Sequence, residues 1–456
     1  MGATTCSEMV SSVSQPLCRR RIPPPGLSPT ISCSRRHSRG LCILRSSAKV
    51  PRISILRKLP MNRVFYWCGL TVTQPFNTGI QRVTRCLAAE LQKRGTEIIP
   101  IKWNARKNGV SIISGKEAEI FAAYSGPNIS LPDRLPMNLK GEWMIVPEVI
   151  VPMVVPGSNP VRWANDQGMK TAAIFYDLIP LKTATDLHAK HLELFAEYWR
   201  MFAEADLVLP ISKESESDMV WWLGHNGHHI PEVKTVYLAG ELPGIPRSAK
   251  SKKESETFNL VSVGSIEPRK NHVAVIRAVL DAREQTGVDI RLTIIGRTIR
   301  DAYPELHVLV DNLMAKSNGA ITLRESVGDE EMNDILSDAD ATVFGSWLEG
   351  FGLPVLESLW RGLPCICHNG SSIGEIAPGG GTVMVDMTAQ DRITDAIIEL
   401  ATSPDQLEEL TAEASRRHVK TWAEYADDVA NALEIEKIDH TPFYFMMTDY
   451  LLRRNL

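Results

Sequence analysis

The sequence predicts an α/β protein built of two doubly wound, Rossmann-like domains that face a cleft. One observation is that strand-like and helix-like segments alternate from residue 63 to residue 402, which is typical of parallel sheets with helices on both faces. Another is a polar stretch at 243–257, with Pro243, Gly244 and Pro246, that divides the alternation in two. The third is the length of 456 residues, which suits about three domains of ordinary size or two large ones.

In the first half, the spacing of apolar residues predicts one long helix and several short strands. The apolar residues at helical spacing are Ile80, Val83, Leu87 and Leu91. Gly95 ends this helix. Strands are expected at 63–70, 98–101, 143–146, 171–175 and 205–211. Ser212 follows the last of these strands and is placed to cap another helix.

In the second half, strands and helices alternate more clearly. Strands are expected at 258–264, 290–295, 320–323, 341–345, 364–368 and 382–385. Helices are expected at 271–286, 301–316, 329–338, 354–361 and 389–402. The predicted organisation is a first domain at 61–245, a linker at 246–257, a second domain at 258–425, and C-terminal helices at 426–456 that return to the first domain. Since doubly wound domains bind ligands at the carboxyl ends of their strands, functional residues are expected there.

Residues 1–60 differ in composition from the rest of the chain. They carry eleven basic side chains but a single acidic one, Glu8, together with eleven serines. Because they lack apolar periodicity, we expect a disordered tail. The tail is either a transit-like segment or a stretch upstream of the true start at Met61.

Composition argues against several partners and compartments. The formal net charge of −4 gives no reason to expect nucleic acid as a partner. No run of eighteen apolar residues predicts a membrane-spanning helix. The four cysteines beyond residue 60 are scattered, as expected in a reducing, cytoplasmic compartment. The apolar and basic segment 443–456 either packs on the first domain or makes peripheral contact with the inner face of a membrane.

The segment from Glu349 to Glu357 carries the strongest functional signal. It follows a predicted strand, has the sequence EGFGLPVLE, and places a proline at the first position of a helix. The amides of Phe351, Gly352 and Leu353 are expected to face the cleft at a positive helix end. Such a site suits phosphate or sugar hydroxyls, and the two glutamates are spaced to hold two parts of an extended ligand. The alternative for Glu357 is an acid that merely stabilises the helix N-terminus.

Two further segments fall at the carboxyl end of a predicted strand. Arg269 and Lys270 stand side by side before a helix, where two adjacent cations suit a diphosphate. A solvated basic pair is the alternative. Gly79 lies between the first strand and first helix of the other domain, a position that faces phosphate or sugar. Its surroundings match neither the dinucleotide fingerprint nor the P-loop.

Together these motifs resemble the retaining glycosyltransferases of family 4, the glycosyl transferases group 1, and in particular a bacterial mannosyltransferase-like branch. The resemblance extends from about residue 63 to about residue 430. It is most specific at 258–385, where Glu-x7-Glu, Glu-Pro-Arg-Lys-Asn and Gly374-Glu375 occur in the family's order. The sequences TGIQRV at 78–83 and YDLIP at 176–180 resemble acceptor-side motifs of polysaccharide-building members.

The resemblance implies a GT-B fold and a hexosyltransferase. The donor would be a nucleotide-diphosphate sugar, either GDP-mannose or a UDP-sugar, with mannose favoured as the transferred hexose. The acceptor would be a saccharide or a lipid-linked saccharide in polysaccharide or glycolipid biosynthesis. Transfer would retain the anomeric configuration, and neither a metal ion nor a cofactor besides the donor substrate is required.

The resemblance also implies roles for the residues of the second domain. Arg269 and Lys270 would hold the donor diphosphate. Glu349 and the amides of 351–353 would hold the transferred sugar. Glu357 would hold the ribose hydroxyls.

Two residues of the first domain complete the implied site. Gly79 would close the cleft, and Asp177 is our candidate to orient or deprotonate the acceptor. Many relatives have His before this aspartate, whereas this chain has Tyr176. The alternative for Asp177 is a turn-forming residue before Pro180.

Two patterns that look metal-binding are not expected to hold a metal. Asp338 and Asp340 fall at a predicted helix end. The histidines His225, His228 and His229 lack a carboxylate or cysteine at matching spacing.

Two functions of other classes stay open. The sequence Gly-Ser-Ser-Ile-Gly at 370–374 matches the nucleophile elbow of serine hydrolases, with Ser372 as the nucleophile and Asp386 and His418 as possible partners. The other is a nucleotide-sugar-binding protein of the same fold without catalytic activity.

Overall fold

The computed structural model describes residues 63–150, 159–183, 189–247 and 256–435. The expectations for the tail, for most of the linker and for the segment 443–456 concern residues outside these ranges. Within the ranges, every predicted strand overlaps an observed strand and every predicted helix overlaps an observed helix. The two-domain α/β architecture is therefore confirmed.

The first sheet has its topological switch point next to the loop that follows β1. Its described strands run in the order β3-β2-β1-β4-β5-β6-β7 and are parallel except for the β2–β3 pair. They are β1 Arg63–Trp67, β2 Glu97–Asn104, β3 Gly109–Ile112, β4 Trp143–Val146, β5 Lys170–Phe175, β6 Leu207–Pro210 and β7 Glu232–Val233. The order reverses between β1 and β4, and doubly wound domains bind ligands at such a reversal.

The second sheet is parallel throughout its described strands, in the order β10-β9-β8-β11-β12-β13. They are β8 Thr257–Val263, β9 Asp289–Ile295, β10 Ile321–Arg324, β11 Ala341–Phe344, β12 Cys365–His368 and β13 Thr382–Val385. Here the order reverses between β8 and β11, where Thr342 lies opposite Val261. This register brings the loops after β8 and β11 to one edge of the sheet.

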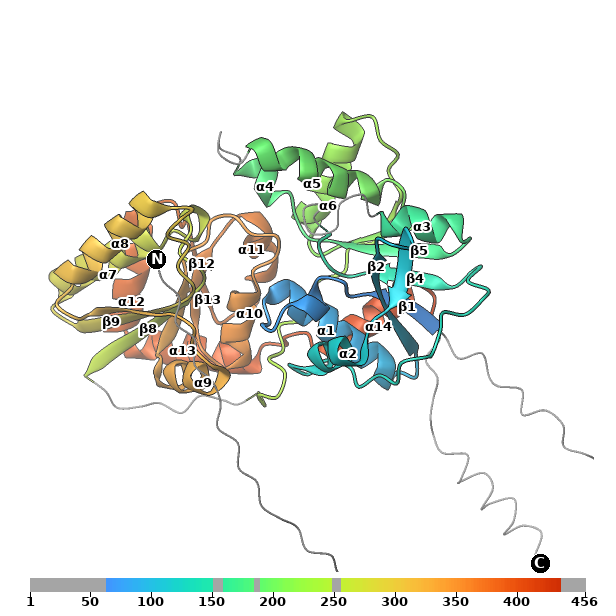
Figure 1. Cartoon of the computed structure of the whole chain (residues 1–456). Helices are drawn as coiled ribbons and strands as arrows, with labels where there is room; N and C mark the ends of the chain where they lie inside the picture. Colours follow the sequence, from blue (N-terminus) through green and yellow to red (C-terminus); the bar gives the residue numbers. More distant parts are fainter. Residues whose placement is uncertain (1–62, 151–158, 184–188, 248–255, 436–456) are drawn as a thin grey trace, which may run out of the picture. The chain divides into compact units, whose positions relative to one another are not determined.

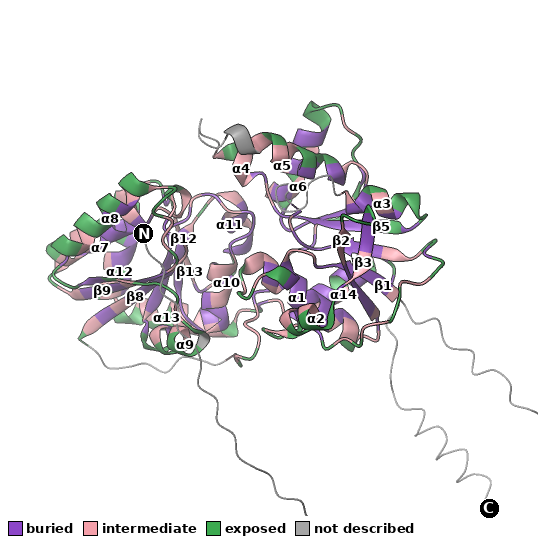
Figure 2. Ribbon diagram, viewed as in Figure 1, coloured by how far each residue is buried: buried purple, intermediate pink, exposed green. Residues whose placement is uncertain are grey.

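Helices pack on both faces of each sheet (Figure 1). In the first domain they are α1 Gly79–Lys93, α2 Gly115–Ala122, α3 Pro160–Asp166, α4 Ile179–Lys182, α5 Ala189–Phe202 and α6 Lys213–His225, with the 3-10 turn η1 Thr71–Thr73. In the second they are η2 Pro268–Lys270, α7 His272–Thr286, α8 Pro304–Lys316, α9 Asp329–Asp338, α10 Leu353–Trp360, α11 Ser371–Ile376, α12 Gln390–Thr402 and α13 Pro404–Arg416, followed by α14 Trp422–Ala432. Figure 2 shows buried strands, with exposure concentrated on the outer sides of the helices.

The alternation of side chains along β1 divides the core of the first domain. Val64 and Tyr66 belong to one buried cluster, whereas Phe65 and Trp67 belong to another. Successive residues of a strand point to opposite faces, so each cluster fills one side of the sheet. Both faces are therefore covered.

The chain returns to the first domain through α14. Tyr425 of α14 belongs to the same buried cluster as Val83 and Leu87 of α1, and the two helices lie in contact. The indole N–H of Trp422 donates to the carbonyl of Glu241 at 3.0 Å. This contact ties the start of α14 to the last described segment of the first domain.

Two buried ionisable side chains, Arg85 and Glu148, hold the loop between β1 and α1. Arg85 is completely buried, and its guanidinium donates to the carbonyls of Gln74 at 3.1 Å and Phe76 at 3.0 Å. Glu148, equally buried, accepts from the amide and hydroxyl of Thr71 at 2.9 and 2.6 Å. Burial raises the pKa of Glu148 to about 7, although the hydrogen bonds from Thr71 oppose the rise. Arg85 thus donates hydrogen bonds to carbonyls of the loop, whereas Glu148 accepts a hydrogen bond from a backbone amide of the loop.

Replacing Arg85 by methionine is expected to lower the free energy of unfolding by on the order of 3 kcal/mol, because each buried carbonyl left without a donor costs about 1–3 kcal/mol. Urea unfolding followed by circular dichroism measures this change. The exposed Arg134→Met is the matched control and should stay within about 0.5 kcal/mol of the wild type. Equal losses in the two variants would contradict the role assigned to Arg85.

Candidate functional site

Glu349 lies between the two cations at the edge of the second sheet. Its Oε1 is 2.8 Å from Arg269 Nη1, and it also pairs directly with Lys270 Nζ. Ser346 Oγ donates a hydrogen bond to the same oxygen at 2.6 Å. Burial alone would raise the pKa of Glu349, but Lys270 and Arg269 outweigh it and hold that pKa below its ordinary value. Glu349 is therefore an ionised group at the centre of a charged cluster.

The basic pair is mostly withdrawn from solvent and paired with Glu349, which corrects the alternative of a solvated pair. The side chains of Arg269 and Lys270 are 19% and 12% exposed. Arg269 also donates to the carbonyl of Leu348 at 3.1 Å and to Glu267 at 2.9 Å, so its guanidinium is held in place. A diphosphate that binds this pair has to displace Glu349 or share the cations with it.

The turn before α10 depends on a glycine. Gly352 has φ 108° and ψ 42°, a left-handed conformation that side chains other than glycine's disfavour. Helix α10 begins directly afterwards at Leu353, and no side chain caps its N-terminus. The preceding Phe351 is buried, with its ring centroid 6.2 Å from that of Tyr237. The amides of 351–353 thus stand at the positive end of α10.

Helix α1 of the first domain touches this segment at two points. Arg82 forms an ion pair with Glu357 of α10. A Cβ on Gly79 would lie 3.3 Å from Leu353 Cδ1, so the glycine permits close approach of α1 to α10. The carboxylate predicted to hold the ribose is therefore in contact with the first domain.

Asp177 lies against the same loop. A Cβ on Gly350 would be 2.9 Å from Asp177 Oδ2 and equally close to the carbonyl of Tyr176, so only glycine fits. The other oxygen, Oδ1, accepts from the amide of Ile179 at 2.9 Å, which is the turn role considered for this residue. Burial raises the pKa of Asp177 to about 6; Glu349 adds to the rise, whereas the Ile179 amide and Arg269 oppose it. The structure thus places Asp177 beside the charged cluster.

Two serines that were not predicted as site residues fix this junction. Ser212 caps α6, accepting from the amide of Ser215 at 3.0 Å, as the sequence predicted. Its hydroxyl also donates to the carbonyl of Gly350 at 2.9 Å. The hydroxyl of Ser215 donates to the backbone carbonyl of Tyr176 at 2.6 Å. The backbone on either side of the Asp177–Gly350 contact is therefore held by α6.

Glu375 is a third residue that was not predicted as a site residue. Its carboxylate accepts from the amides of Lys213 at 2.8 Å and Glu214 at 2.7 Å, the first turn of α6, and from the Tyr237 hydroxyl at 2.8 Å. A carboxylate at a helix N-terminus is electrostatically favoured. The motif Gly374-Glu375 was the one signal in the sequence that singled out this glutamate. It could not predict the contacts with Lys213 and Glu214, which lie about 160 residues away along the chain.

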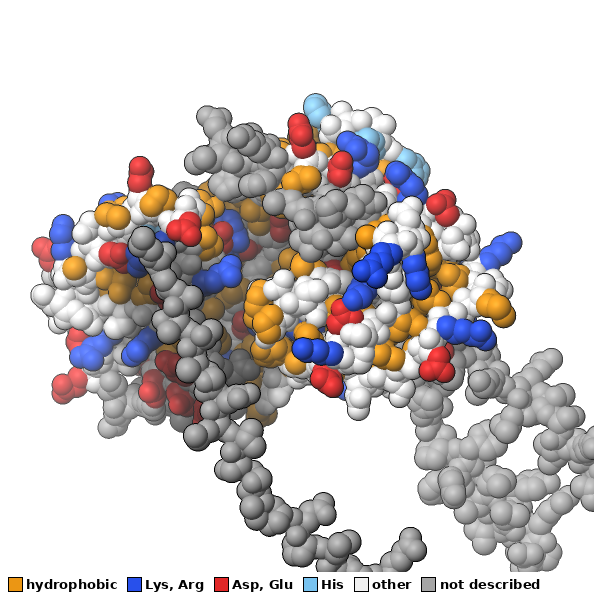
Figure 3. Space-filling model, viewed as in Figure 1, with side chains coloured by type: hydrophobic (Ala, Val, Ile, Leu, Met, Phe, Trp, Pro, Cys, Tyr) orange, Lys and Arg blue, Asp and Glu red, His pale blue; other side chains and the backbone are white. Residues whose placement is uncertain are grey.

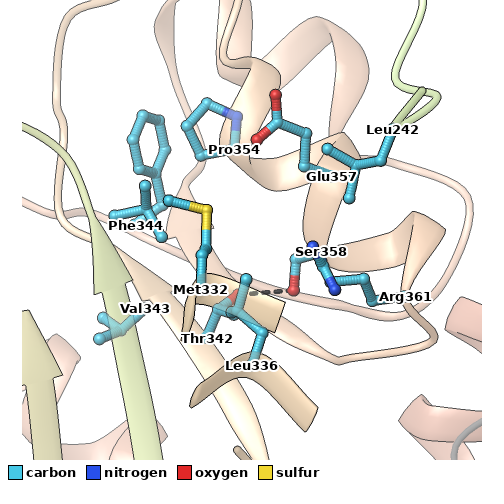
Figure 4. Close-up of a pocket in the computed structure, with 11 residues that line it drawn as sticks. Leu242, Met332, Leu336, Thr342, Val343, Phe344, Pro354, Glu357, Ser358 and Arg361 are labelled. Atoms are coloured by element: carbon cyan, nitrogen blue, oxygen red, sulfur yellow. Dashed lines mark hydrogen bonds between the residues drawn. The ribbon is translucent and has the colours of Figure 1, made fainter. Parts of the chain in front are cut away.

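A small cavity lies between α9 and α10 at the edge of the second sheet (Figure 4). Its volume of about 30 Å³ accommodates water-sized molecules. The lining residues are Leu242, Val263, Met332, Leu336, Thr342, Val343, Phe344, Pro354, Glu357, Ser358 and Arg361. Thr342 and Ser358 share a hydrogen bond of 2.7 Å at its base, and Glu357 stands beside Pro354 on α10. Apolar walls thus adjoin the carboxylate of Glu357.

The hydrolase alternative fails on geometry. Ser372 is completely buried, and its hydroxyl donates to the carbonyl of Glu349 at 2.8 Å. The proposed base, His418, is exposed and lies 3.2 Å from Glu424, while Asp386 accepts from Thr388. Ser372 therefore supports the backbone of Glu349, and the required Ser–His pair is not formed.

The described residues contain no group of three or more His, Cys, Asp or Glu side chains arranged to hold a metal ion. Asp340 instead accepts from the amide of Asn259 at 2.7 Å. None of the described helices is long and apolar enough to cross a membrane. Acidic and basic side chains are interspersed over the face seen in Figure 3.

Two doubly wound domains with this strand order define the GT-B class of fold. Among solved structures, sucrose-phosphate synthase from Thermosynechococcus elongatus is similar with a TM-score of 0.57 and 15% identity, over 82% of this chain and 98% of that one. This likeness confirms the predicted fold class.

The family follows from the sequence of the second domain. Residues 246–417 match the family described as glycosyl transferases group 1. The serotype-specific mannosyltransferase WbdA of Escherichia coli is 24% identical over 323 residues, which are 66% of this chain and 38% of that protein. The O-antigen chain mannosyltransferase B of Escherichia coli is 26% identical over 241 residues, 50% of this chain and 61% of that protein. The chain thus spans less than two thirds of either relative.

Proposed function

We propose that the protein is a retaining, metal-independent glycosyltransferase that moves a hexose, with mannose favoured, from a nucleotide-diphosphate sugar to a saccharide or lipid-linked acceptor. One observation carries the proposal: two partly buried cations, the carboxylate of Glu349 and the carboxylate of Asp177 meet at the carboxyl edges of two doubly wound sheets. The family of residues 246–417 supports glycosyl transfer. Two similar proteins with mannosyltransferase in their names favour mannose and polysaccharide biosynthesis.

The donor is expected to lie along α10 and the basic pair. Arg269 and Lys270 would bind the diphosphate, and Glu357 the ribose hydroxyls. Glu349 and the amides of 351–353 would bind the transferred sugar. Gly79 allows α1 to close over this segment.

The chemistry then needs no covalent nucleophile. The bond between the anomeric carbon and the diphosphate oxygen breaks, and its electron pair leaves with the diphosphate. The acceptor oxygen attacks from the same face and loses its proton to the departing phosphate, while Asp177 orients the hydroxyl or assists its deprotonation. Arg269 and Lys270 stabilise the charge that develops on the leaving group.

Calorimetric titration with GDP, UDP and ADP in the presence of EDTA tests the donor class and the metal independence together. Turnover of GDP-mannose or UDP-glucose on methyl α-mannoside, with the anomeric configuration followed by NMR, tests the reaction. An inverted product would overturn retention. Nucleotide binding without turnover on any saccharide would favour the non-catalytic binding protein, and binding of no nucleotide would overturn the donor site.

The proposed location is the cytoplasm, with peripheral contact at the inner face of the membrane through 443–456. Sedimentation with vesicles of phosphatidylglycerol tests it. If this segment contacts the membrane, deletion of 443–456 should reduce sedimentation with the vesicles. Unchanged sedimentation would contradict the proposed membrane contact.

Replacing Lys270 by methionine is expected to weaken nucleoside diphosphate binding about tenfold or more, because a charge-assisted hydrogen bond contributes about 1.5–3 kcal/mol. Binding of the corresponding nucleoside should change little, since it has no phosphate for Lys270 to hold. The exposed Lys213→Met serves as the control. Equal weakening for nucleoside and diphosphate would contradict the assignment.

A further inference from the structure

Two exposed aromatic side chains lie beside the loop that enters α1. Phe76 is 44% exposed and Tyr124 is 42% exposed. The Tyr124 hydroxyl donates to the carbonyl of Pro75 at 2.6 Å, and its ring centroid lies 5.2 Å from the Arg85 guanidinium. Arg85 also donates to the carbonyl of Phe76 at 3.0 Å. Both aromatic residues are therefore held by one buried cation.

The backbone at Tyr124 is held in a strained arrangement. Tyr124 and Ser125 have φ of 53° and 65°, a left-handed region that such residues rarely adopt. A Cβ on Gly126 would lie 1.9 Å from the carbonyl oxygen of Phe121, so only glycine fits at this position of the turn. Strain of this kind persists where surrounding contacts hold it and is common at binding sites. A surface already ordered before binding loses little entropy when a ligand arrives.

The loop leads directly to the candidate site. Phe76 is three residues before Gly79, and three residues span at most about 11 Å. Gly79 itself faces Leu353 at the start of α10, the segment proposed to hold the transferred sugar. The backbone of Phe76 therefore lies within about 11 Å of Gly79, and Tyr124 is tied to the same loop through Pro75.

We propose that Phe76, with Tyr124 beside it, forms a subsite that binds a pyranose ring of the acceptor saccharide. Pyranose rings present a face of C–H groups that packs on an aromatic ring, while their hydroxyls need polar neighbours. The polar residues next to Phe76 in the loop are Gln74, Asn77 and Thr78. Such neighbours suit a sugar better than a membrane interior. The inference deepens the proposed function and rests on it for the identity of the acceptor.

The first test is binding without turnover. Saturation-transfer difference NMR uses the methyl α-glycosides of mannose, glucose, galactose and N-acetylglucosamine with the full-length chain. We expect saturation of ring protons of at least one glycoside in the wild type and its loss in Phe76→Ala. Phe76→Trp should restore it, and the exposed Met137→Ala should leave it unchanged. Binding of no glycoside, or equal saturation in wild type and Phe76→Ala, would overturn the subsite.

The second test is kinetic. Phe76→Ala should raise the acceptor KM about tenfold, the size of one lost ring contact, and leave the donor KM and the release of sugar to water unchanged. Tyr124→Phe, which loses only the bond to Pro75, should raise the acceptor KM less. An unchanged acceptor KM with reduced sedimentation on phosphatidylglycerol vesicles would overturn the subsite in favour of a membrane contact. Calorimetry with GDP and UDP reads the donor site separately, so failure of the proposed function is distinguished from failure of this subsite.

Discussion

Replacing Asp177 by asparagine should lower the turnover number of sugar transfer by about 10²-fold or more, the range in which a positioned acid–base group acts. Asparagine keeps the size of the side chain and the oxygen that accepts from the Ile179 amide. It removes the negative charge that would orient or deprotonate the acceptor hydroxyl. Since Asp177 lies against Gly350 and not on the basic pair, the dissociation constant for the nucleotide should stay within about twofold.

The same residue predicts the direction of the pH dependence. Burial raises the pKa of Asp177 to about 6, so its carboxylate is ionised above that pH and protonated below it. The rate of transfer in the wild type should therefore fall as the pH drops through about 6. The residual activity of Asp177→Asn should lack this acid limb.

A matched control and a clear contrary result are available. Asp166→Asn changes an exposed aspartate at the end of α3 and should retain both the rate and the acid limb. An acid limb that persists unchanged in Asp177→Asn would assign the titration to another group. A wild-type turnover number in Asp177→Asn would leave this residue with the turn role only.

The parallel strands were predictable because each buried strand is a short, continuous apolar run. The helices between them have apolar residues at a different spacing, three to four residues apart. Some of the missed elements, among them α2 and β3, have a cap or a turn as their signal. Ser114 and Glu117 form a capping box that starts α2, and Asn108-Gly109 marks the turn into β3. Both signals stand in the sequence but carry little apolar periodicity. Helix α11 has only six residues, too few for any helical period to appear.

For the candidate site, the sequence predicts only which residues lie at the same edge of the second sheet. Arg269, Lys270 and Glu349 follow strands that are neighbours in a parallel sheet, so their proximity follows from the fold. That Glu349 binds both cations does not follow, because it depends on side-chain packing within the edge.

Contacts between the two domains were beyond the sequence altogether. Ser212 and Gly350 are 138 residues apart, and Arg82 and Glu357 are 275 apart. No local pattern links such pairs, since each side chain satisfies its own local role as a cap or a surface charge.

Replacing Glu357 by alanine is expected to weaken nucleotide binding about ten- to hundredfold, because charge-assisted hydrogen bonds to the ribose contribute about 1.5–3 kcal/mol. Unlike Lys270→Met, this change should weaken the nucleoside and the diphosphate equally. Calorimetric titration of each ligand measures the difference. An affinity equal to that of the wild type would contradict the placement of the ribose.

The ion pair with Arg82 supplies the control that separates two roles of Glu357. If the carboxylate serves only to join α10 to α1, Arg82→Met and Glu357→Ala should weaken nucleotide binding alike. If it holds the ribose, only Glu357→Ala should do so, because Arg82→Met leaves the carboxylate in place. The 2′,3′-dideoxynucleotides sharpen the test: loss of the ribose 2′- and 3′-hydroxyls should weaken binding to the wild type and to Arg82→Met. It should make no further difference to Glu357→Ala, since the partner of those hydroxyls is already gone.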